Sequence, residues 1–253
     1  MKYTTWYDKK LDKTFVIRKR KELKITKNAR YNKHPDADYT DLWIAGEMKQ
    51  YFKYITLQEN DIWADFGANI GLFGVLIYDK VKRIYGYEPH PENCEVLKEN
   101  IKYHKINNYE LIEKAIVSDK SLEKIILYLH SDMACHSLTK YPRASISEME
   151  VPVIDINSIF EQHPDINKVK MDIEGAEYDI ILGYDKWDRF DELLFEWHSR
   201  PNKTKEEYVE GHKYKELIDY ISHFFPYVSY PKKLRFGVGM VHCKKNKTKD
   251  EIS

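Results

Sequence analysis

Apolar and polar residues alternate along this chain in blocks that predict strands and helices in regular succession. Four short apolar runs have the length of buried strands, and each is followed by a segment whose apolar residues have helical spacing. The runs are 62–66, 83–88, 168–172 and 192–197, and the helical segments are 71–80, 91–104, 175–183 and 205–224. Strands and helices that alternate in this order predict an α/β fold with a parallel sheet.

Shorter apolar runs complete the pattern. We expect strands at 109–117, 124–129 and 150–153, a helix at 155–162, and a closing antiparallel hairpin made of 227–230 and 238–243. Five strand–helix units followed by a hairpin predict a Rossmann-like sheet of seven strands with helices on both faces. Residues 131–149 are polar and are expected to form a loop, where a lid over a binding site would lie.

The N-terminal residues are interpreted as a basic extension. Phe15–Ile17 and Leu23–Ile25 are expected to pair as a hairpin outside the core, before a helix at 40–55. The basic residues either line a solvated edge that discourages aggregation or form a patch for an acidic or phosphorylated acceptor. The predicted divisions are the extension at 1–39, a main domain at 40–245 and a flexible tail at 246–253.

Composition limits the partners and the compartment. The chain has 253 residues with 41 Lys and Arg against 41 Asp and Glu, so its formal net charge is zero. That balance argues against nucleic acid as a partner, although a local basic patch stays open. Cys94, Cys135 and Cys243 lie far apart and predict reduced thiols, with neither a disulfide framework nor a zinc site. No apolar stretch is long enough for a signal peptide or a membrane span, so a soluble, cytoplasmic protein is expected.

The segment 61–74 joins a buried strand to a helix through a glycine-rich turn. Gly67 and Gly71 let the backbone turn sharply and approach a ligand closely, and the following helix directs free N–H groups toward that ligand. Asp65 precedes the turn, and Asn69 takes the place of the middle glycine of a dinucleotide-binding motif. Asp65 would repel a pyrophosphate but attract an ammonium or sulfonium cation.

Glu88 ends the next strand of the pattern. A carboxylate there can accept hydrogen bonds from both ribose hydroxyls of a nucleoside. An acid at the end of each of these two strands favours S-adenosylmethionine over NAD. His90 follows Glu88 closely and is placed to lie against the adenine ring, or else is an ordinary loop histidine.

A second group of polar residues ends two other strands. Asp172 ends the strand expected at 168–172 and Glu174 follows it, and Glu196 and His198 end the strand that begins at 192. The carboxyl ends of parallel strands meet at one edge of a sheet, so these side chains should converge. A hydroxyl acceptor of a methyl group needs either a base or a metal that lowers its pKa. Either His198 removes the proton while Glu196 or Asp172 orients it, or Asp172 and Glu196, with or without Glu174, hold Mg²⁺ or Mn²⁺.

These motifs together resemble the FkbM-type methyltransferases. The resemblance covers residues 60–200 and lies in segments that follow one another in family order: 65–71, 87–93 with 97–100, 115–119, 151–153, 170–177 and 194–198. It implies a class I methyltransferase fold and an S-adenosylmethionine-dependent O-methyltransferase whose acceptor is a sugar or glycan hydroxyl or another small molecule. The expected cofactor-binding residues are Asp65, Phe66, Gly67, Ala68, Asn69, Gly71, Glu88, His90, Ala115, Ile116 and Asp172, and the expected catalytic residues are His198, Asp172, Glu196 and Glu174.

Other functions stay open at this point. The acceptor is alternatively a hydroxyl of a secondary metabolite, or an RNA or other nucleic acid bound by the basic segments. A module that binds the cofactor without catalysis is a further alternative, which the charged residues at the strand ends argue against. An NAD-dependent oxidoreductase is disfavoured by Asp65 and Asn69. The acceptor, the metal requirement and the oligomeric state do not follow from the sequence.

Overall fold

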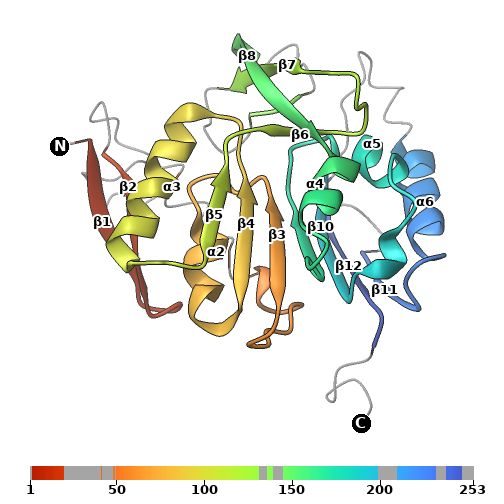
Figure 1. The fold of residues 1–253 in the computed structure, drawn as a ribbon, viewed down its shortest axis with the longest axis horizontal. Helices are drawn as coiled ribbons and strands as arrows, with labels where there is room; N and C mark the ends of the chain where they lie inside the picture. The colour runs from red at the N-terminus through yellow and green to blue at the C-terminus, as the bar shows by residue number, and fades with distance from the viewer. Residues whose placement is uncertain are drawn as a thin grey trace.

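The computed structural model describes residues 2–19, 41, 48, 50–130, 136–138, 145–198, 210–231 and 238–246. A seven-stranded sheet runs through the middle of these residues, in the order β11-β12-β10-β9-β3-β4-β5 (Figure 1). Its strands are β3 (Ile62–Phe66), β4 (Arg83–Tyr87), β5 (Tyr109–Ile112), β9 (Lys168–Met171), β10 (Glu192–His198), β11 (Tyr227–Ser229) and β12 (Val238–Lys244).

The topology confirms the predicted Rossmann-like sheet. Strands β10, β9, β3, β4 and β5 are parallel to their neighbours, and β12 is antiparallel to both β10 and β11. The first strand of the main sheet in the sequence, β3, therefore lies at the centre of the five parallel strands. The carboxyl ends of β3, β4, β9 and β10 all open at the same edge, which is where ligands bind in sheets of this kind.

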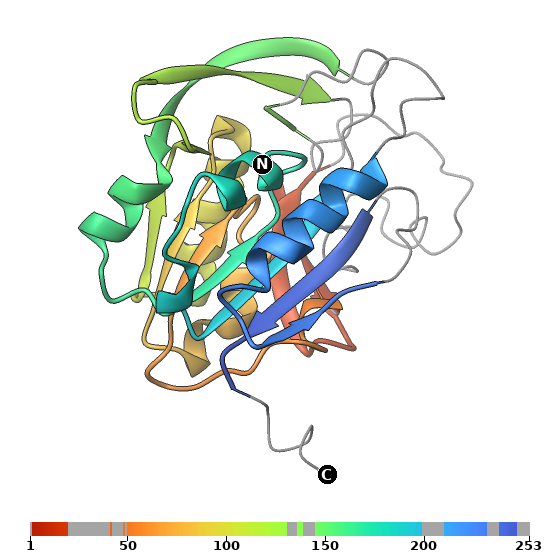
Figure 2. The ribbon, with the colours of Figure 1, turned by 90° about the vertical axis from the view of Figure 1, so that its right-hand side faces the viewer.

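Helices cover both faces of the sheet and bury two separate cores. On one face, α2 (Leu72–Ile77) and α3 (Pro91–His104) pack over Trp63 and Ile84. On the other face lie α4 (Ile156–Gln162), α5 (Glu177–Leu182) and α6 (Glu210–Ile221), and Figure 2 shows α6 alongside β12. Two single turns of 3₁₀ helix, η1 (Tyr78–Lys80) and η2 (Trp187–Arg189), complete the covering layers.

A second sheet of three strands was not predicted from the sequence. It has the order β6-β8-β7 and comprises β6 (Ala115–Val117), β7 (Lys124–His130) and β8 (Ser145–Asp155). The single strand expected at 109–117 is in fact two strands in different sheets, because the exposed residues Glu113 and Lys114 form a tight turn in which the Lys114 amide donates to Ile112. Strand β8 also begins well before the expected residue 150.

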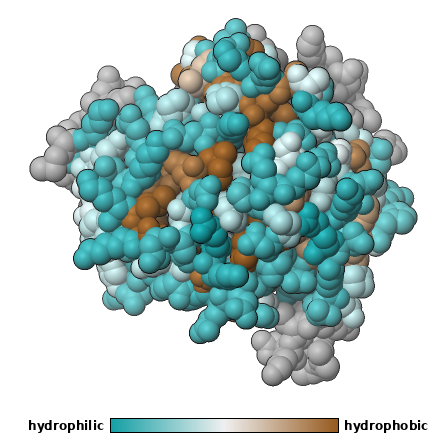
Figure 3. All heavy atoms as spheres, in the orientation of Figure 1, coloured by the Kyte–Doolittle hydropathy of each residue, from teal (hydrophilic) through white to brown (hydrophobic). Residues whose placement is uncertain are grey.

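The three-stranded sheet crosses the top of the main sheet in Figure 1, above the carboxyl ends of its strands. Its inner side buries Leu127, Val151 and Val153, while Ile126 and Ile146 on the other side are exposed. Figure 3 shows a mostly hydrophilic surface with hydrophobic patches, one of them in this upper region. The sheet therefore forms a roof over the edge where a ligand would bind.

The N-terminal hairpin consists of β1 (Tyr3–Asp8) and β2 (Lys13–Arg18), which pair antiparallel. The strand expected at 15–17 is thus the second strand of the hairpin, and the one expected at 23–25 lies outside the described residues. Phe15 and Ile17 are fully buried in the core shared with α2 and Trp63, so this hairpin packs on the main domain. In the helix expected at 40–55, the described residues 41, 48, 50 and 51 are helical and turns follow from 52.

Cys94 and Cys243 are buried free thiols, and Cys135 lies outside the described residues. Among the helices that the structure describes, none is both long and apolar enough to cross a bilayer.

Candidate functional site

The glycine-rich turn after β3 brings two strand ends into direct contact. Gly67 has a φ of +75°, and a Cβ built there would lie 1.8 Å from the carbonyl oxygen of Asp172. The amides of Gly67 and Ala68 donate to the carbonyl of Tyr87 at the end of β4, at 3.1 and 3.0 Å. Only glycine allows this approach, because any side chain would collide with the end of β9. The turn thereby joins the ends of β3, β4 and β9 into one floor.

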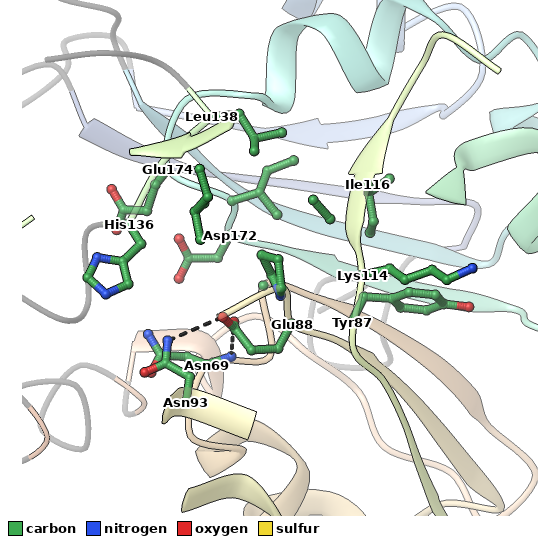
Figure 4. A pocket seen from close by; sticks show the side chains of 15 residues that line it. Asn69, Tyr87, Glu88, Asn93, Lys114, Ile116, His136, Leu138, Asp172 and Glu174 are labelled. Carbon is green, nitrogen blue, oxygen red and sulfur yellow. Dashed lines mark hydrogen bonds between the residues drawn. The ribbon is translucent and has the colours of Figure 1, made fainter. Parts of the chain in front are cut away.

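A pocket opens between this floor and the three-stranded sheet (Figure 4). Seven of the residues predicted from the sequence line it: Gly67, Asn69, Glu88, Ala115, Ile116, Asp172 and Glu174. Residues that were not predicted also contribute, among them Tyr87 and Asn93 from the floor side and Leu127, His136 and Leu138 from the roof side. The pocket has carboxylates at its floor and edge and apolar side chains at its roof.

Glu88 is held rigidly at the floor of the pocket. Its Oε2 accepts a hydrogen bond from the Asn69 amide at 2.9 Å, and its Oε1 accepts from the His90 amide at 2.9 Å and from Asn93 Nδ2 at 3.2 Å. Figure 4 shows these bonds to Asn69 and Asn93 as dashed lines. Burial raises the pKa of Glu88, while the three donors lower it. A carboxylate has about four acceptor sites, so one on Oε2 stays available to a ligand.

His90 does not line the pocket, although the sequence placed it against an adenine ring. It is buried, and its ring lies 4.3 Å from that of His136, centroid to centroid. His136 is the histidine that reaches the pocket, and in Figure 4 it stands at one side, opposite Tyr87. Burial, together with the neighbouring His90 and His130, lowers the pKa of His136 to about 3. His136 is therefore an uncharged ring at neutral pH.

Asp65 is paired inside the protein and does not line the pocket. It is fully buried, and its Oδ1 lies 3.1 Å from Nζ of Lys170. Lys170 also donates to the carbonyl of Gly67 at 2.9 Å, so its ammonium supports the glycine turn from below. Burial raises the pKa of Asp65, and Lys170 opposes that rise. The negative charge that the sequence offers to a cofactor cation is thus largely compensated by Lys170.

Asp172, Glu174, Glu196 and His198 converge at the edge of the pocket, as the strand order predicted. Nε2 of His198 lies 3.6 Å from Glu174 Oε2 and 3.9 Å from Asp172 Oδ1. Of these four residues, Asp172 and Glu174 line the pocket itself. We call this group, together with Glu177, the acid–histidine cluster.

Glu177 orients the histidine of the cluster. It is fully buried, and its Oε1 lies 3.0 Å from His198 Nδ1 and also accepts from the amide of Ile173. Both of its oxygens accept from the amide of Gly175, so the same side chain fixes the turn before α5. The hydrogen bond to Nδ1 leaves Nε2 of His198 facing Asp172 and Glu174.

Tyr51 links the two strand ends of the cluster. Its hydroxyl lies 2.6 Å from Asp172 Oδ2 and 3.2 Å from Glu196 Oε2. A hydroxyl has one proton and donates it to one acceptor at a time, so the second carboxylate is better accommodated when it carries a proton. Burial and the charge of Asp172 raise the pKa of Glu196 to about 7, although His198 and Tyr51 lower it.

The cluster carries more negative than positive charge. Burial raises the pKa of Glu174 to about 8, with Asp172 and Glu177 adding to the rise and His198 opposing it. For His198 itself, burial alone would lower the pKa, but the carboxylates of Glu174 and Glu177 raise it well above its ordinary value. These groups therefore share protons near neutral pH. Groups with pKa values near the working pH can accept a proton from a substrate.

Asp172, Glu174 and His198 have the composition and spacing of a metal-binding set. Each offers one ligand atom, and these atoms all lie within 4.8 Å of one another. Two carboxylates suit a hard divalent cation, and histidine ligands commonly donate the other ring N–H to a carboxylate, the position that Glu177 takes beside Nδ1 of His198. Glu196, which the sequence suggested as a ligand, is not one of the three.

Three other predicted residues support the site without facing it. Phe66 is fully buried against Tyr87 and Phe160, so its side chain belongs to the core. Ala68 is buried beneath the turn, and Gly71 has a φ of +82° at the start of α2, where a Cβ would meet Leu97.

Sequence reasoning missed the role of Tyr51 and the pairing of Lys170. The observed partner of Lys170, Asp65, is its register neighbour on β3, so the pairing follows once the strand order is known. For Tyr51 no motif in the sequence gave a signal.

Comparison with known proteins finds similarity to methyltransferases. A profile of the family described as Methyltransferase FkbM domain matches residues 65–226. Methyltransferase 1 of Beauveria bassiana is 23% identical over 155 residues, which cover 52% of this chain and 62% of that protein. An uncharacterized protein of Methanocaldococcus jannaschii is 35% identical over 57 residues, which cover 22% of each chain. The matches thus span less than two thirds of either relative's length.

Among solved structures, an rRNA methylase from Streptococcus thermophilus is similar with a TM-score of 0.46 and 8% identity. The match covers 83% of this chain and 98% of that one.

Proposed function

This chain belongs to the FkbM methyltransferase family, and from that membership we propose that it transfers a methyl group from S-adenosylmethionine to a hydroxyl of a sugar or glycan. The observation that carries the proposal is the position of the acid–histidine cluster. It lies at the edge of a pocket whose floor presents Glu88, so a nucleoside held by Glu88 would direct its reactive group toward Asp172.

The pocket supports a nucleoside by complementary chemistry. Glu88 has an acceptor site left for a ribose hydroxyl after its three internal hydrogen bonds. Ile116, Leu127 and Leu138 offer an apolar surface of the kind that covers a purine ring. S-adenosylmethionine brings an activated methyl carbon, so the protein mainly has to position the two reactants.

An acceptor hydroxyl needs to lose its proton as the methyl group is transferred. His198 and the carboxylates around it accept that proton: the oxygen–hydrogen bond breaks, the oxygen bonds to the methyl carbon, and the carbon–sulfur bond breaks to leave S-adenosylhomocysteine. Glu174 and Glu177 favour the protonated imidazole, and an imidazolium cannot accept a second proton. The base is therefore the fraction of the coupled His198–Glu174 pair that has a free site for one. A general base of this kind accelerates such a step by about 10²–10⁴-fold.

Vicinal hydroxyls fit the cluster better than an isolated one. Asp172 and Glu196 are hydrogen-bond acceptors on neighbouring strands, bridged by the hydroxyl of Tyr51. Adjacent hydroxyl groups of a sugar can donate to two such carboxylates at once, whereas an isolated hydroxyl reaches one of them. This favours sugars over simple alcohols and over bases of nucleic acids as the acceptor.

A divalent cation would be held by Asp172, Glu174 and His198, whose ligand atoms fit one. When bound, Mg²⁺ or Mn²⁺ would lower the pKa of an acceptor hydroxyl. Titration of the protein with Mn²⁺, followed by electron paramagnetic resonance, tests this set. We expect binding that Glu174→Gln weakens and that Glu110→Gln, a change of an exposed acid on β5, leaves unchanged. Equal binding by all three proteins would exclude the set.

Cofactor binding is tested by calorimetric titration with S-adenosylhomocysteine. We expect binding by the wild-type protein and a loss of at least tenfold in affinity for Glu88→Ala, since about 1.4 kcal/mol corresponds to a factor of ten. Glu110→Ala is the matched control, because Glu110 pairs with Arg83 at the surface and not in the pocket. A folded wild-type protein that does not bind would overturn the proposal.

The acceptor is tested by incubating the protein with S-adenosylmethionine carrying a labelled methyl group and three panels of acceptors. The panels are mono- and polysaccharides, hydroxylated secondary metabolites, and RNA. We expect label in the saccharide panel, in an alkali-stable ether linkage, and its loss with His198→Gln. Label in RNA, with binding that falls steeply as salt rises, would replace the sugar with nucleic acid as the acceptor.

A further inference from the structure

We propose that Arg18 of the N-terminal hairpin is a positioning residue of the cofactor site, acting through Asn93 on Glu88. The inference rests on the proposed binding of S-adenosylmethionine at Glu88. It assigns a role to a segment that lies outside the matched family region, which begins at residue 65. The hairpin would then be a part of the binding site and not an accessory surface strand.

A continuous chain of buried polar contacts joins the hairpin to the pocket. Nη2 of Arg18 donates to Oδ1 of Asn93 at 2.5 Å, and Nδ2 of Asn93 donates to Oε1 of Glu88 at 3.2 Å. Arg18 is 8% exposed, Asn93 2% and Glu88 5%, so water competes little for these bonds. Both hydrogen bonds are therefore buried, and removing one partner would leave the other polar group buried without a hydrogen bond, which costs free energy.

Arg18 determines which way the Asn93 amide points. An asparagine side chain has an oxygen that only accepts and a nitrogen that only donates. A guanidinium only donates, so Arg18 holds the Asn93 oxygen on its own side and leaves the NH₂ group facing Glu88. If the amide turned over, its oxygen would face the carboxylate and repel it. Arg18 thus fixes the donor that holds Oε1 of Glu88.

With Oε1 occupied by Asn93 and His90, the carboxylate cannot rotate, and Oε2 keeps its free acceptor site toward the pocket. Ribose binding depends on that orientation, because a carboxylate that turns freely loses rotational entropy when it binds a ligand. The expected consequence is weaker cofactor binding, with little direct effect on the transfer step.

Arg18 is itself held in place on the other side. Its backbone amide donates to Oδ2 of Asp41 at 2.7 Å, and its Nη1 lies 3.7 Å from Oδ1 of Asp41. Asp41 is fully buried. The guanidinium is therefore kept in position by a carboxylate from a third segment of the chain, as a positioning group needs to be.

A second polar contact attaches the hairpin to the same helix. Asn100 of α3 accepts from the amide of Val16 at 2.7 Å and donates to the carbonyls of Val16 and Ile70, at 2.8 and 3.0 Å. Asn93 and Asn100 lie about two helical turns apart and thus on one face of α3. Since Ile70 belongs to the glycine-rich turn, Asn100 links the hairpin to that turn, as Asn93 links it to Glu88.

The test is a double-mutant cycle on the affinity for S-adenosylhomocysteine, measured by calorimetry. We expect Arg18→Met to weaken binding about tenfold, as for the loss of one hydrogen bond to a charged group. We expect Asn93→Leu to do the same. In a Glu88→Ala background Arg18→Met should have no further effect, because the residue through which it acts is absent. Lys13→Met, on the same strand but paired with Asp79 at the surface, is the matched control.

Kinetics separate positioning from a purely structural role. With a labelled-methyl assay, Arg18→Met should raise the KM for S-adenosylmethionine about tenfold and change kcat less than about twofold. If the Arg18→Met variant does not fold, the Asn93→Leu variant tests the inference. It removes the same series of hydrogen bonds between Arg18 and Glu88 and leaves Arg18 beside Asp41. No binding by wild type would overturn the proposed function itself. Two results would overturn this inference alone. In the first, Glu88→Ala weakens binding but neither Arg18→Met nor Asn93→Leu does. In the second, Arg18→Met lowers the affinity equally in the wild-type and in the Glu88→Ala background.

Discussion

Two groups of buried charges lie at the two ends of one central strand, and they differ in how their charges are balanced. Lys168 begins β9, and Lys170 and Asp172 lie at its other end. At the amino end, Nζ of Lys168 lies 2.9 Å from Asp61 and 3.0 Å from Glu192, and Glu192 in turn lies 2.6 Å from Nε2 of His242. All four side chains are at least nine-tenths buried, and none of them lines the pocket described above.

At the carboxyl end the acids outnumber the bases. Lys170 pairs with Asp65, but within the described part of the chain the only basic side chain at ion-pair distance from Asp172, Glu174 or Glu177 is His198, and Glu196 lies beside them. This end also borders the pocket. The comparison shows that buried charge alone does not identify a functional site: the amino-end network is closed and internally paired, whereas the carboxyl-end cluster has an excess of acceptors that faces a cavity.

The largest predicted effect is a loss of stability when the charge network at the amino end of β9 is disrupted. Lys168→Met leaves Asp61 and Glu192 buried without a cation, and we expect the free energy of unfolding to fall by about 3–5 kcal/mol. Urea denaturation measures the loss. Lys98→Met is the control, because Lys98 pairs with Glu113 at the surface and exposed pairs contribute about 0–1 kcal/mol. An unchanged stability for Lys168→Met would mean that the network is not structural.

At the carboxyl end the corresponding effect should appear in activity. His198→Gln keeps a polar side chain but removes the base, so kcat should fall about 10²-fold or more, which is about 3 kcal/mol in the barrier. The affinity for S-adenosylhomocysteine should stay within about twofold of wild type, since His198 does not line the pocket. A small change in kcat, in a folded variant that binds, would remove His198 from the proposed chemistry.

A smaller change in stability, of opposite sign, is expected at the carboxyl end of β9. Because the pKa of Glu174 is raised to about 8, its buried carboxyl has to take up a proton when the protein folds at neutral pH. Glu174→Gln removes that requirement, and we expect the free energy of unfolding to rise by about 1 kcal/mol in the presence of a chelator. The residue has a φ of +55°, which Gln tolerates as well as Glu. Thermal denaturation measures the change. A loss of stability would show that Glu174 is as well paired as the acids at the amino end.

The last prediction concerns the roof of the pocket and the dependence of stability on pH. Burial lowers the pKa of His136 from 6.5 to about 3, so the folded protein favours the neutral ring while the unfolded chain binds a proton. The contribution of the neutral His136 ring to the free energy of unfolding is fully retained above about pH 6.5 and is lost progressively as the pH falls toward 3. The wild-type stability should therefore fall more steeply than that of His136→Phe, by at most about 1.4 kcal/mol per pH unit. Parallel curves in chemical denaturation between pH 4 and 7 would contradict this.

Much of the main sheet could be predicted from the sequence because local patterns determine it. The apolar runs at 62–66 and 168–171 and the Pro91 start of α3 gave strands and a helix at the observed positions. The break between β5 and β6 was missed, since two polar residues inside an apolar stretch do not reveal a change of sheet. The roof formed by β8 was missed for the same reason: its pairing with β6 and β7 is a long-range property.

The sequence by itself determined that acids would end neighbouring strands beside a glycine-rich turn, because the order of strands and the alternation of side chains are properties of the local pattern. It could not determine which of those acids would be compensated. Asp65 faces Lys170 only because β3 and β9 lie side by side. Tyr51 reaches Asp172, and Arg18 reaches Asn93, across long stretches of chain. Such contacts depend on the packing of whole segments, so only the tertiary structure decided which charges face the pocket and which are held inside.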